Sequence, residues 1–440
     1  MNISKLTSIL EGELIQKGKN NTFKKVKIDS RKVEKGDLFI AIRGKNQDGH
    51  DYIPEAIRNG ASIIVAEKPV KARKQTIIRV PNTLASFHAL AHYYRKKYPL
   101  PIIAVTGSAG KTTTKELISI VLEPYYKVLK SEKSYNNHIG VPLTLLQLSD
   151  TYDVVVMELG MNHAGEISNL SKICEPDLAV ITNIGTSHIG ELGSRKKILK
   201  AKMEILDGMR EHGILILNDD DFYLHKVKEN DRQSIYRIGT GESADLSVIK
   251  LDRAFQFHFQ EKDYIIPILE DYLLPNYLIA VQIGLLFGLT VEQITENLEK
   301  FQMKDSRMET IEKNHFTIID DSYNGSYESF EAALSSFDVN KDYVFVIGDM
   351  AELGRYQKRY HKKLGVLLQK FKNKNLLLVG EDVKYIAKKN KDDSILFDSN
   401  EKLIEYLKEI EIENKIVFIK GSHRMNLHDV RTYLENRPSN

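Results

Sequence analysis

The fold is decided by residues 102–122, which read IIAVTGSAGKTTTKELISIVL. An apolar run, Ile102–Val105, is followed by a glycine-containing turn and then by apolar residues at helical spacing. This order predicts a strand, a phosphate-binding turn and a helix, in which backbone N–H groups and the helix N-terminus bind phosphate oxygens. Lys111 is placed to reach the terminal phosphates, and the Thr112 hydroxyl is placed to hold Mg²⁺. We therefore expect nucleotide binding in an α/β domain.

The turn is shorter than the general phosphate-loop motif. Val105 stands six residues before Lys111, at a position where that motif has a glycine. The loop alone does not distinguish a kinase, an NTP-driven binding or regulatory module and a ligase, because function depends on the rest of the site.

Apolar runs alternate with helical segments along the chain and indicate its domains. One series follows the phosphate loop and consists of Ile102–Val105, Val154–Met157, Leu178–Ile181 and Ile214–Leu217. A second series takes Phe316–Ile319 as its first strand and continues with Tyr343–Ile347, Leu376–Val379 and Ile416–Ile419. Such runs are typical of strands buried on both faces of a parallel sheet. Two prolines near residue 100 favour a linker there, so we expect α/β domains at 1–98, 99–308 and 309–440.

The composition is that of a soluble globular protein. Of 440 residues, 42% are hydrophobic, and 63 Lys+Arg against 60 Asp+Glu leave a net charge of +3. This balance gives no general electrostatic reason to bind nucleic acid or an anionic membrane. The one cysteine, Cys174, cannot form an internal disulfide, and no apolar run approaches the length of a membrane span. We expect a cytoplasmic location without membrane insertion or a nucleic-acid partner.

Candidate metal ligands follow strands of the first series. Glu158 ends one apolar run, and His188 lies a few residues beyond the next. Open α/β sheets collect their ligands at the carboxyl ends of strands, which makes both residues candidate ligands. Lys202 lies farther along, and by itself it is typical of an exposed helix lysine, because three other lysines are close to it in the sequence.

Several segments resemble the Mur ligases, which are ATP-dependent amide ligases of cell-wall precursor synthesis. The short loop Thr106–Thr112 has the form typical of that family. Other segments similar to its central domain are Asn136–Pro142, Glu158–Gly160, Asn162–His163, Gly165–Ile167 and Ala201–Ile205. The resemblance covers nearly the whole chain. It implies an α/β fold with a UDP-precursor-binding N-terminal domain, a central P-loop parallel-sheet ATPase domain and a C-terminal Rossmann-like domain.

The resemblance also implies roles for single residues. Thr112, Glu158 and His188 would hold magnesium, and Lys202 would be carbamylated, which replaces an ammonium by a carboxylate-like group that Mg²⁺ accepts. The resemblance implies four catalytic residues, which are Lys111, Glu158, His188 and Lys202. Contacts to ATP are implied for Thr106, Gly107, Ser108, Ala109, Gly110, Lys111, Thr112, Thr113, Asn276, Arg307 and Asp321.

Further segments bear on the substrate. The stretch around Ser30 and Arg31 resembles the family's UDP-binding domain, which implies that both residues contact the UDP precursor. Ile318–Gly325 looks like the Asp-Asp-Ser-Tyr-Asn-Ala motif of the branch that adds D-alanyl-D-alanine to UDP-N-acetylmuramoyl-tripeptide. Asn137 and Asn324 are the implied substrate contacts in the remaining domains.

The chain departs from the family pattern at two places. Gly325–Tyr327 replaces the usual Ala-Asn-Pro, and Asp271–Asn276 keeps only the last Asn of the family's His-Asn-x-x-Asn. The adenine contacts are therefore left open.

The implied reaction activates a carboxylate as an acyl phosphate, which an amine then attacks. The tripeptide-forming ligase of the same family and a folate-type glutamate ligase are alternatives, although the UDP-like N-terminal segment argues against the latter. An NTP-driven module is the alternative outside this class. We expect a monomer, and no residue identifies the third amino acid of the peptide, whether lysine, diaminopimelate or another.

Overall fold

A central parallel sheet carries the phosphate loop. The computed structural model describes residues 1–437 except 21, 45, 133–134, 230 and 304–305. The strands of this sheet are β6 (Ile102–Thr106), β7 (Val128–Lys130), β8 (Val154–Glu158), β9 (Leu178–Ile181), β10 (Ile214–Asn218), β11 (Ser234–Gly239) and β12 (Leu246–Ser247). They lie in the order β12-β11-β10-β9-β6-β8-β7, with parallel pairings. β6, which leads into the phosphate loop, is thus an interior strand between β8 and β9.

Helices cover both faces of the central sheet. On β6, Ile102 and Ala104 belong to one hydrophobic core and Ile103 and Val105 to another, because successive residues of a strand point to opposite faces. The helices of this unit are α4 (Lys111–Leu122), α5 (Gly140–Leu145), α6 (Glu166–Cys174), α7 (Ile189–Leu192), α8 (Arg195–Met203), α9 (Leu274–Leu286) and α10 (Val291–Leu298), with 3₁₀ turns η3 (Glu204–Asp207) and η4 (Asp271–Leu273). Side chains of α4, α9 and α10 fill one core, and those of α5, α6 and α8 contribute to the other. This two-sided burial explains why the strands read as continuous apolar runs.

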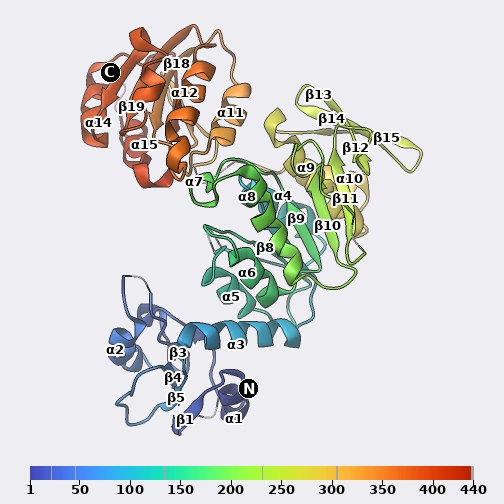
Figure 1. Cartoon of the computed structure of the whole chain (residues 1–440), viewed down its shortest axis with the longest axis vertical. Helices are drawn as coiled ribbons and strands as arrows, with labels where there is room; N and C mark the ends of the chain where they lie inside the picture. The colour runs from blue at the N-terminus through green and yellow to red at the C-terminus, as the bar shows by residue number, and fades with distance from the viewer. Residues whose placement is uncertain (21, 45, 133–134, 230, 304–305, 438–440) are drawn as a thin grey trace.

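The N-terminal unit is a smaller mixed sheet. Its elements are α1 (Ile3–Ile9), β1 (Glu13–Gln16), β2 (Val26–Lys27), η1 (Ser30–Lys32), β3 (Leu38–Ile40), η2 (Gly49–Tyr52), α2 (Ile53–Arg58), β4 (Ile63–Ala66), β5 (Thr76–Arg79) and α3 (Thr83–Lys97). The strand order is β1-β5-β4-β3-β2, and β1 runs antiparallel to β5. The long helix α3 packs against α5 and α6 and so connects this unit to the central one (Figure 1).

The C-terminal unit is a second, mostly parallel sheet. Its elements are β16 (Glu309–Glu312), β17 (Thr317–Asp320), α11 (Tyr327–Ser335), β18 (Asp342–Gly348), η5 (Gly354–Tyr356), α12 (Gln357–Leu368), β19 (Asn373–Val379), α13 (Lys384–Ala387), η6 (Lys391–Asp393), β20 (Ser394–Phe397), α14 (Asn400–Glu409), β21 (Ile416–Lys420), η7 (His423–Met425) and α15 (His428–Glu435). The order is β16-β17-β21-β18-β19-β20. Figure 1 shows this unit at the opposite end of the molecule from the N-terminal sheet.

The predicted α/β class with parallel sheets is confirmed, and one detail of the prediction is wrong. The run Phe316–Ile319 is not the first strand of the C-terminal unit, because β16 precedes it and pairs antiparallel with β17. A small antiparallel sheet of β13 (Ile249–Leu251), β14 (Ala254–Phe259) and β15 (Lys262–Pro267) was not predicted at all. Within the described residues, no helix is both long and apolar enough to cross a membrane.

Candidate active site

One large cavity collects the predicted site residues from distant parts of the chain. Its volume is about 1100 Å³, and its lining runs from Leu84 and His88 on α3 to Lys420 at the end of β21. The predicted site residues in this lining are Ser108, Ala109, Gly110, Lys111, Thr112, Thr113, Asn137, Glu158, His188, Asn276, Arg307, Asp321 and Asn324. Five predicted residues are not part of this lining, as far as the described residues show. They are Thr106, Gly107, Lys202, Ser30 and Arg31.

The phosphate loop is shaped by two glycines. Gly107 has φ 154°, and a Cβ there would lie 1.8 Å from the Thr182 hydroxyl oxygen. Gly110 has φ 79°, lines the cavity and is the N-cap of α4, so the first turn of that helix begins at the loop. The Lys111 ammonium folds back and donates to the Gly107 carbonyl at 2.9 Å. Burial lowers the pKa of Lys111, while the nearby Glu158 carboxylate opposes that shift.

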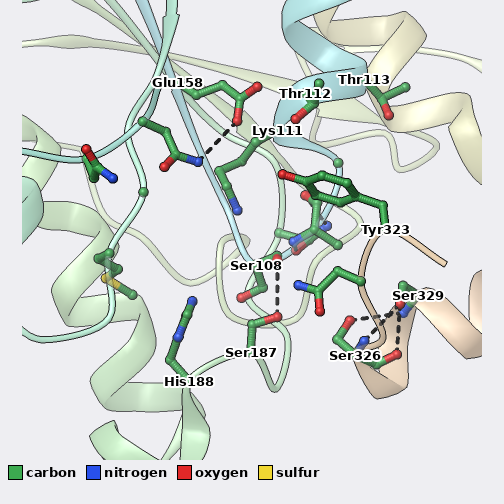
Figure 2. A pocket seen from close by; sticks show the side chains of 18 of the residues that line it. Ser108, Lys111, Thr112, Thr113, Glu158, Ser187, His188, Tyr323, Ser326 and Ser329 are labelled. Carbon is green, nitrogen blue, oxygen red and sulfur yellow. Dashed lines mark hydrogen bonds between the residues drawn. The ribbon is translucent and has the colours of Figure 1, made fainter. Parts of the chain in front are cut away.

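The loop after β9 holds the phosphate loop in place, which the sequence reasoning missed. The Asn183 side chain accepts from the Ala109 N–H at 3.0 Å and donates to the Ala109 carbonyl at 3.2 Å. The Ser187 hydroxyl donates to the Ser108 carbonyl at 3.1 Å, as Figure 2 shows. Both residues lie between β9 and His188, so their position just before a predicted ligand was the available signal.

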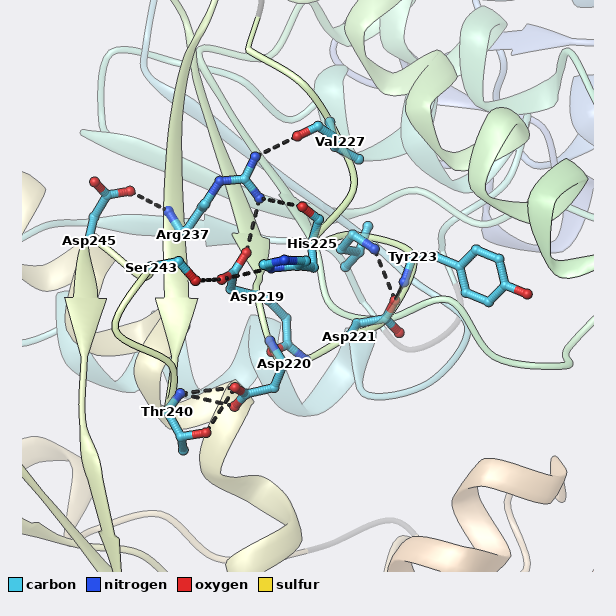
Figure 3. A network of polar contacts seen from close by, with 12 residues as sticks. Asp219, Asp220, Asp221, Tyr223, His225, Val227, Arg237, Thr240, Ser243 and Asp245 are labelled. Carbon is cyan, nitrogen blue, oxygen red and sulfur yellow. Dashed lines mark hydrogen bonds and ion pairs between the residues drawn. The ribbon is translucent and has the colours of Figure 1, made fainter.

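A polar network supports this second loop from behind. Asp221 accepts from the Ile184 N–H at 2.9 Å, and Arg195 donates through Nε to the Ile184 carbonyl at 2.8 Å. The two preceding carboxylates turn elsewhere: Asp219 binds Arg237, Ser243 and His225, and Asp220 binds Thr240 (Figure 3). The backbone N–H and the backbone carbonyl of Ile184 are therefore both held by side chains.

The predicted metal ligands differ in their surroundings. Glu158 is 3% exposed, and its Oε1 has no hydrogen-bond partner among the described residues, whereas Oε2 is 3.5 Å from the Asn136 amide. Lys115, which the sequence reasoning did not single out, lies with its ammonium 3.7 Å from Oε1. His188 pairs through Nδ1 with Glu352 at 2.7 Å. The described residues hold no cluster of three or more His, Cys, Asp or Glu suited to a metal.

Lys202 is not the exposed helix lysine that its neighbours in the sequence suggested. It lies in α8 and is 2% exposed. Burial lowers its pKa far below the ordinary value, and the charge of Lys111 lowers it further. Burial thus disfavours the charged form of Lys202.

Arg307, just before the C-terminal unit, and residues of that unit face the phosphate loop across the cavity. Arg307 donates to the Thr112 hydroxyl at 3.3 Å and lies over the Tyr323 ring, 3.8 Å from its centroid. Asp321 pairs with the buried ammonium of Lys420. Burial raises the pKa of Asp321, although the Lys420 charge opposes the shift.

The segment that departs from the family pattern borders the same cavity. The Asn276 amide donates to the Thr114 hydroxyl at 2.7 Å and to the Gly110 carbonyl at 3.3 Å. Tyr272, which the sequence reasoning did not assign, has a buried hydroxyl without a hydrogen-bond partner in the described part of the chain. Burial raises its pKa, with a smaller contribution from the charge of Asp321.

The predicted substrate residues are spread over the three units. Ser30 donates to Glu55 at 2.5 Å, and Arg31 pairs with Asp29 at 2.8 Å while remaining largely exposed. Asn137 accepts from two backbone N–H groups of its own turn at 3.0 Å. The Asn324 carbonyl accepts from Lys420 at 3.0 Å. The cavity brings Asn137 and Asn324 together, but it does not include the first pair.

The arrangement fits transfer of a phosphoryl group between two bound reactants. A phosphate loop with a lysine, a buried carboxylate and an arginine from the segment just before the C-terminal unit all face one cavity. Cationic groups and backbone N–H groups stabilise the negative charge of a transferring phosphoryl group. The same cavity extends toward both flanking units, so it has room for an acceptor and an amine.

Comparisons with known proteins match all three units of the chain to one family. Residues 22–98 match the Mur ligase family catalytic domain, residues 105–284 the Mur ligase middle domain, and residues 306–423 the Mur ligase glutamate ligase domain. The UDP-N-acetylmuramoyl-tripeptide–D-alanyl-D-alanine ligase of Bacillus subtilis is 32% identical over 92% of each chain. The enzyme of that name from Escherichia coli is 30% identical over 97% of each chain.

Solved structures give the same result. A crystal structure of MurF from Acinetobacter baumannii superposes with a TM-score of 0.90, at 29% identity over 99% of both chains. MurF ligase from Thermotoga maritima in complex with ADP has a TM-score of 0.83, at 27% identity, with 94% of this chain and 97% of that chain covered. From these matches and from the shared three-unit fold around one phosphate loop, we conclude that the chain belongs to the Mur ligase family.

Proposed function

We propose that the chain is an ATP-dependent ligase that joins D-alanyl-D-alanine to UDP-N-acetylmuramoyl-tripeptide. Relatives from Bacillus subtilis and Escherichia coli that are similar along nearly the whole chain are named for this reaction. The observation that carries the proposal is that Asn324 and Asp321, from the segment typical of this branch, line the same cavity as Lys111 and Glu158. An incoming amine held by the C-terminal unit would therefore meet a carboxylate activated at the phosphate loop.

The reaction has two balanced steps. A carboxylate oxygen of the tripeptide attacks the γ-phosphorus of ATP, which forms an acyl phosphate and releases ADP. The dipeptide amine then attacks the acyl carbon, the new C–N bond forms, and phosphate leaves while the amine loses a proton. Lys111 and the loop N–H groups would neutralise the transferring group, and closure of the cavity would exclude water from the acyl phosphate.

The nucleotide is assigned to the central unit and the facing edge of the C-terminal unit. Its phosphates would bind the loop from Thr106 to Thr113. Asn276 would lie beside the adenine, Arg307 would contact phosphate or ribose, and Asp321 would contact the ribose. The hydrogen bond of Arg307 to Thr112 supports a hinge-side contact, because it already brings the guanidinium to the loop.

Divalent magnesium fits the residues around Thr112. The Oε1 of Glu158 supports this fit, because this buried carboxylate oxygen accepts no hydrogen bond from the described residues and has only the more distant Lys115 ammonium at 3.7 Å, so a closer cation would stabilise it. Thr112 and His188, which line the same cavity, would supply further ligands. Bound there, the cation would supply charge neutralisation for the phosphoryl group.

A carbamate on Lys202 would complete the proposed metal site. The neutral amine is the form that adds to CO₂: the nitrogen bonds to the carbon and loses a proton, which leaves an anionic carbamate. Deep burial supports this proposal because it lowers the pKa of Lys202 and so disfavours the charged form, which cannot add to CO₂. Lys202, with Lys111, His188 and Glu158, would then form the catalytic set.

Substrate binding outside the cavity rests on Ser30 and Arg31, which would bind the diphosphate of UDP. Asn137 and Asn324 would contact the peptide and the dipeptide. We also propose the domain limits 1–98, 99–308 and 309–440, a monomeric state and a cytoplasmic location, where peptidoglycan precursors for cell-wall growth and division would be made.

The proposal is tested by product mass. Purified protein with ATP and Mg²⁺ is given either UDP-tripeptide plus D-alanyl-D-alanine or UDP-dipeptide plus a diamino acid. We expect product and ADP from the first pair only, and ADP release should require both the acceptor and the amine. Lys111→Ala is the control and should give no product while keeping its circular dichroism spectrum. Product from the second pair alone would place the chain in the tripeptide-forming branch.

A further inference from the structure

A carboxylate of the C-terminal unit contacts a histidine of the central unit. Glu352 lies between β18 and η5, and its Oε2 is 2.7 Å from Nδ1 of His188. The His188 side chain is 20% exposed and lines the cavity. Figure 2 shows its ring pointing into the pocket on the side of Lys111. The Glu352 side chain is 51% exposed and is not part of the cavity lining.

Backbone contacts fix this approach. The Gly190 N–H donates to the Glu352 carbonyl at 2.8 Å. A Cβ at Gly190 would lie 2.6 Å from that carbonyl oxygen and 2.6 Å from the Gly354 nitrogen, so only a glycine allows the two segments to meet. His188 and Glu352 both have φ 63°, a conformation that non-glycine residues rarely adopt and that persists where the surroundings impose it. The pair is therefore held by its two backbones as well as by its side chains.

The contact decides which ring nitrogen can bind a cation. A carboxylate at Nδ1 keeps the proton on that nitrogen, so the lone pair is on Nε2, and it also fixes the plane of the ring. Carboxylates that orient a metal-binding histidine in this way make the ring a better ligand. Here the carboxylate comes from a different unit of the fold than the histidine.

We infer that Glu352 is a positioning residue that orients His188 toward a divalent cation at the phosphate loop, and that it does so only while the C-terminal unit is docked on the central unit. This inference rests on the proposed function, since it takes His188 as a ligand. Docking of the C-terminal unit would thereby complete the cation site at the same time as it brings the amine.

A purely mechanical contact between the units is the alternative, and the chain offers a matched control for it. Tyr356 donates its hydroxyl to the Gly193 carbonyl at 2.8 Å, across the same interface, without touching His188. Tyr356→Phe removes one docking bond and leaves the ring alone, whereas Glu352→Gln keeps the size of the side chain but removes the charge that holds Nδ1–H.

The experiment uses Mn²⁺ as the probe, with a non-hydrolysable ATP analogue bound to the full-length protein. Electron paramagnetic resonance gives the Mn²⁺ affinity, and spin-echo modulation detects nitrogen coupling from a bound imidazole. We expect Glu352→Gln to lower the Mn²⁺ affinity about 10–100-fold and to weaken the nitrogen coupling. Tyr356→Phe should stay within about 2-fold of the unmodified protein, and the metal-free affinity for the analogue should not change in either variant.

Two results would overturn the inference. Unchanged Mn²⁺ affinity in Glu352→Gln would show that the carboxylate does not orient the ligand, and equal losses in both variants would assign the effect to docking alone. His188→Ala is measured in parallel, because normal nitrogen coupling in that variant would remove His188 from the site and the inference with it. Failure of the proposed reaction is seen separately, as absence of ligated product from the unmodified protein.

Discussion

Replacing Lys420 by Met is expected to destabilise the C-terminal unit. The Lys420 side chain is 1% exposed and pairs with Asp321, whose side chain is 13% exposed. It also donates to the Asn324 carbonyl at 3.0 Å. Removing one partner of a buried pair leaves an uncompensated charge and costs about 3–5 kcal/mol. Because the Asp321 side chain keeps some contact with solvent, we expect the lower end, about 3 kcal/mol.

The loss should depend on pH in a defined direction. Burial already raises the pKa of Asp321 above its unfolded value, so between the two values the folded state binds more protons and stability falls as pH rises. Without Lys420 the pKa of Asp321 in the folded state rises further. The pH range in which stability falls with rising pH then extends to higher pH. The variant should therefore be closest to the unmodified protein near the unfolded pKa of about 4 and weaker at neutral pH.

Calorimetry measures the effect. About 3 kcal/mol corresponds to a drop of roughly 10 °C in the Tm of a unit of this size. The double variant Lys420→Met, Asp321→Asn is the control, since it removes the orphaned charge and should recover most of the loss. A loss below about 1 kcal/mol in the single variant, or a double variant no more stable than the single one, would refute the reasoning.

Two further predictions concern the phosphate loop and the carbamate. Gly107→Ala should weaken ADP binding about 10–100-fold by isothermal titration, because the new methyl group meets the Thr182 hydroxyl at 1.8 Å and φ 154° is strained for alanine; an unchanged Kd would mean that the loop does not bind phosphate in this shape. Protein incubated with ¹³C-bicarbonate should show one carbamate carbon signal that Lys202→Ala lacks, and that variant should lose about 10–100-fold of its activity. Full activity of Lys202→Ala, or an active protein without the signal, would contradict the carbamate.

The parallel sheets could be predicted from the sequence because their strands are buried on both faces. The run Leu178–Ile181 is β9 with the predicted bounds, and Ile102–Val105 differs from β6 by one residue. The small sheet of β13, β14 and β15 escaped prediction for a physical reason. Its turns pass through Arg253 and through Gln260 and Glu261 with positive φ, where glycine or asparagine would normally mark a turn.

Those residues of the candidate site that belong to a local sequence pattern could be located from the sequence. The phosphate loop and His188 follow strands and Glu158 ends one, so their positions in the chain could be inferred from the strand pattern. The burial of Lys202 could not, because α8 carries other lysines and only packing decides which one points inward. The contact of Glu352 with His188 joins two units, and no local pattern encodes such a pairing.

The consecutive carboxylates Asp219, Asp220 and Asp221 set a limit on how this chain can vary in length. Each binds different partners, in three directions, and the first has a side chain only 2% exposed. Deleting or inserting one residue after β10 would move every carboxylate onto its neighbour's partners and leave a buried acid unmatched. Surface connections usually tolerate such changes, but this one should not. A chimaera between two relatives would therefore need to take the segments on both sides of this turn, including Arg237 and Ile184, from the same parent.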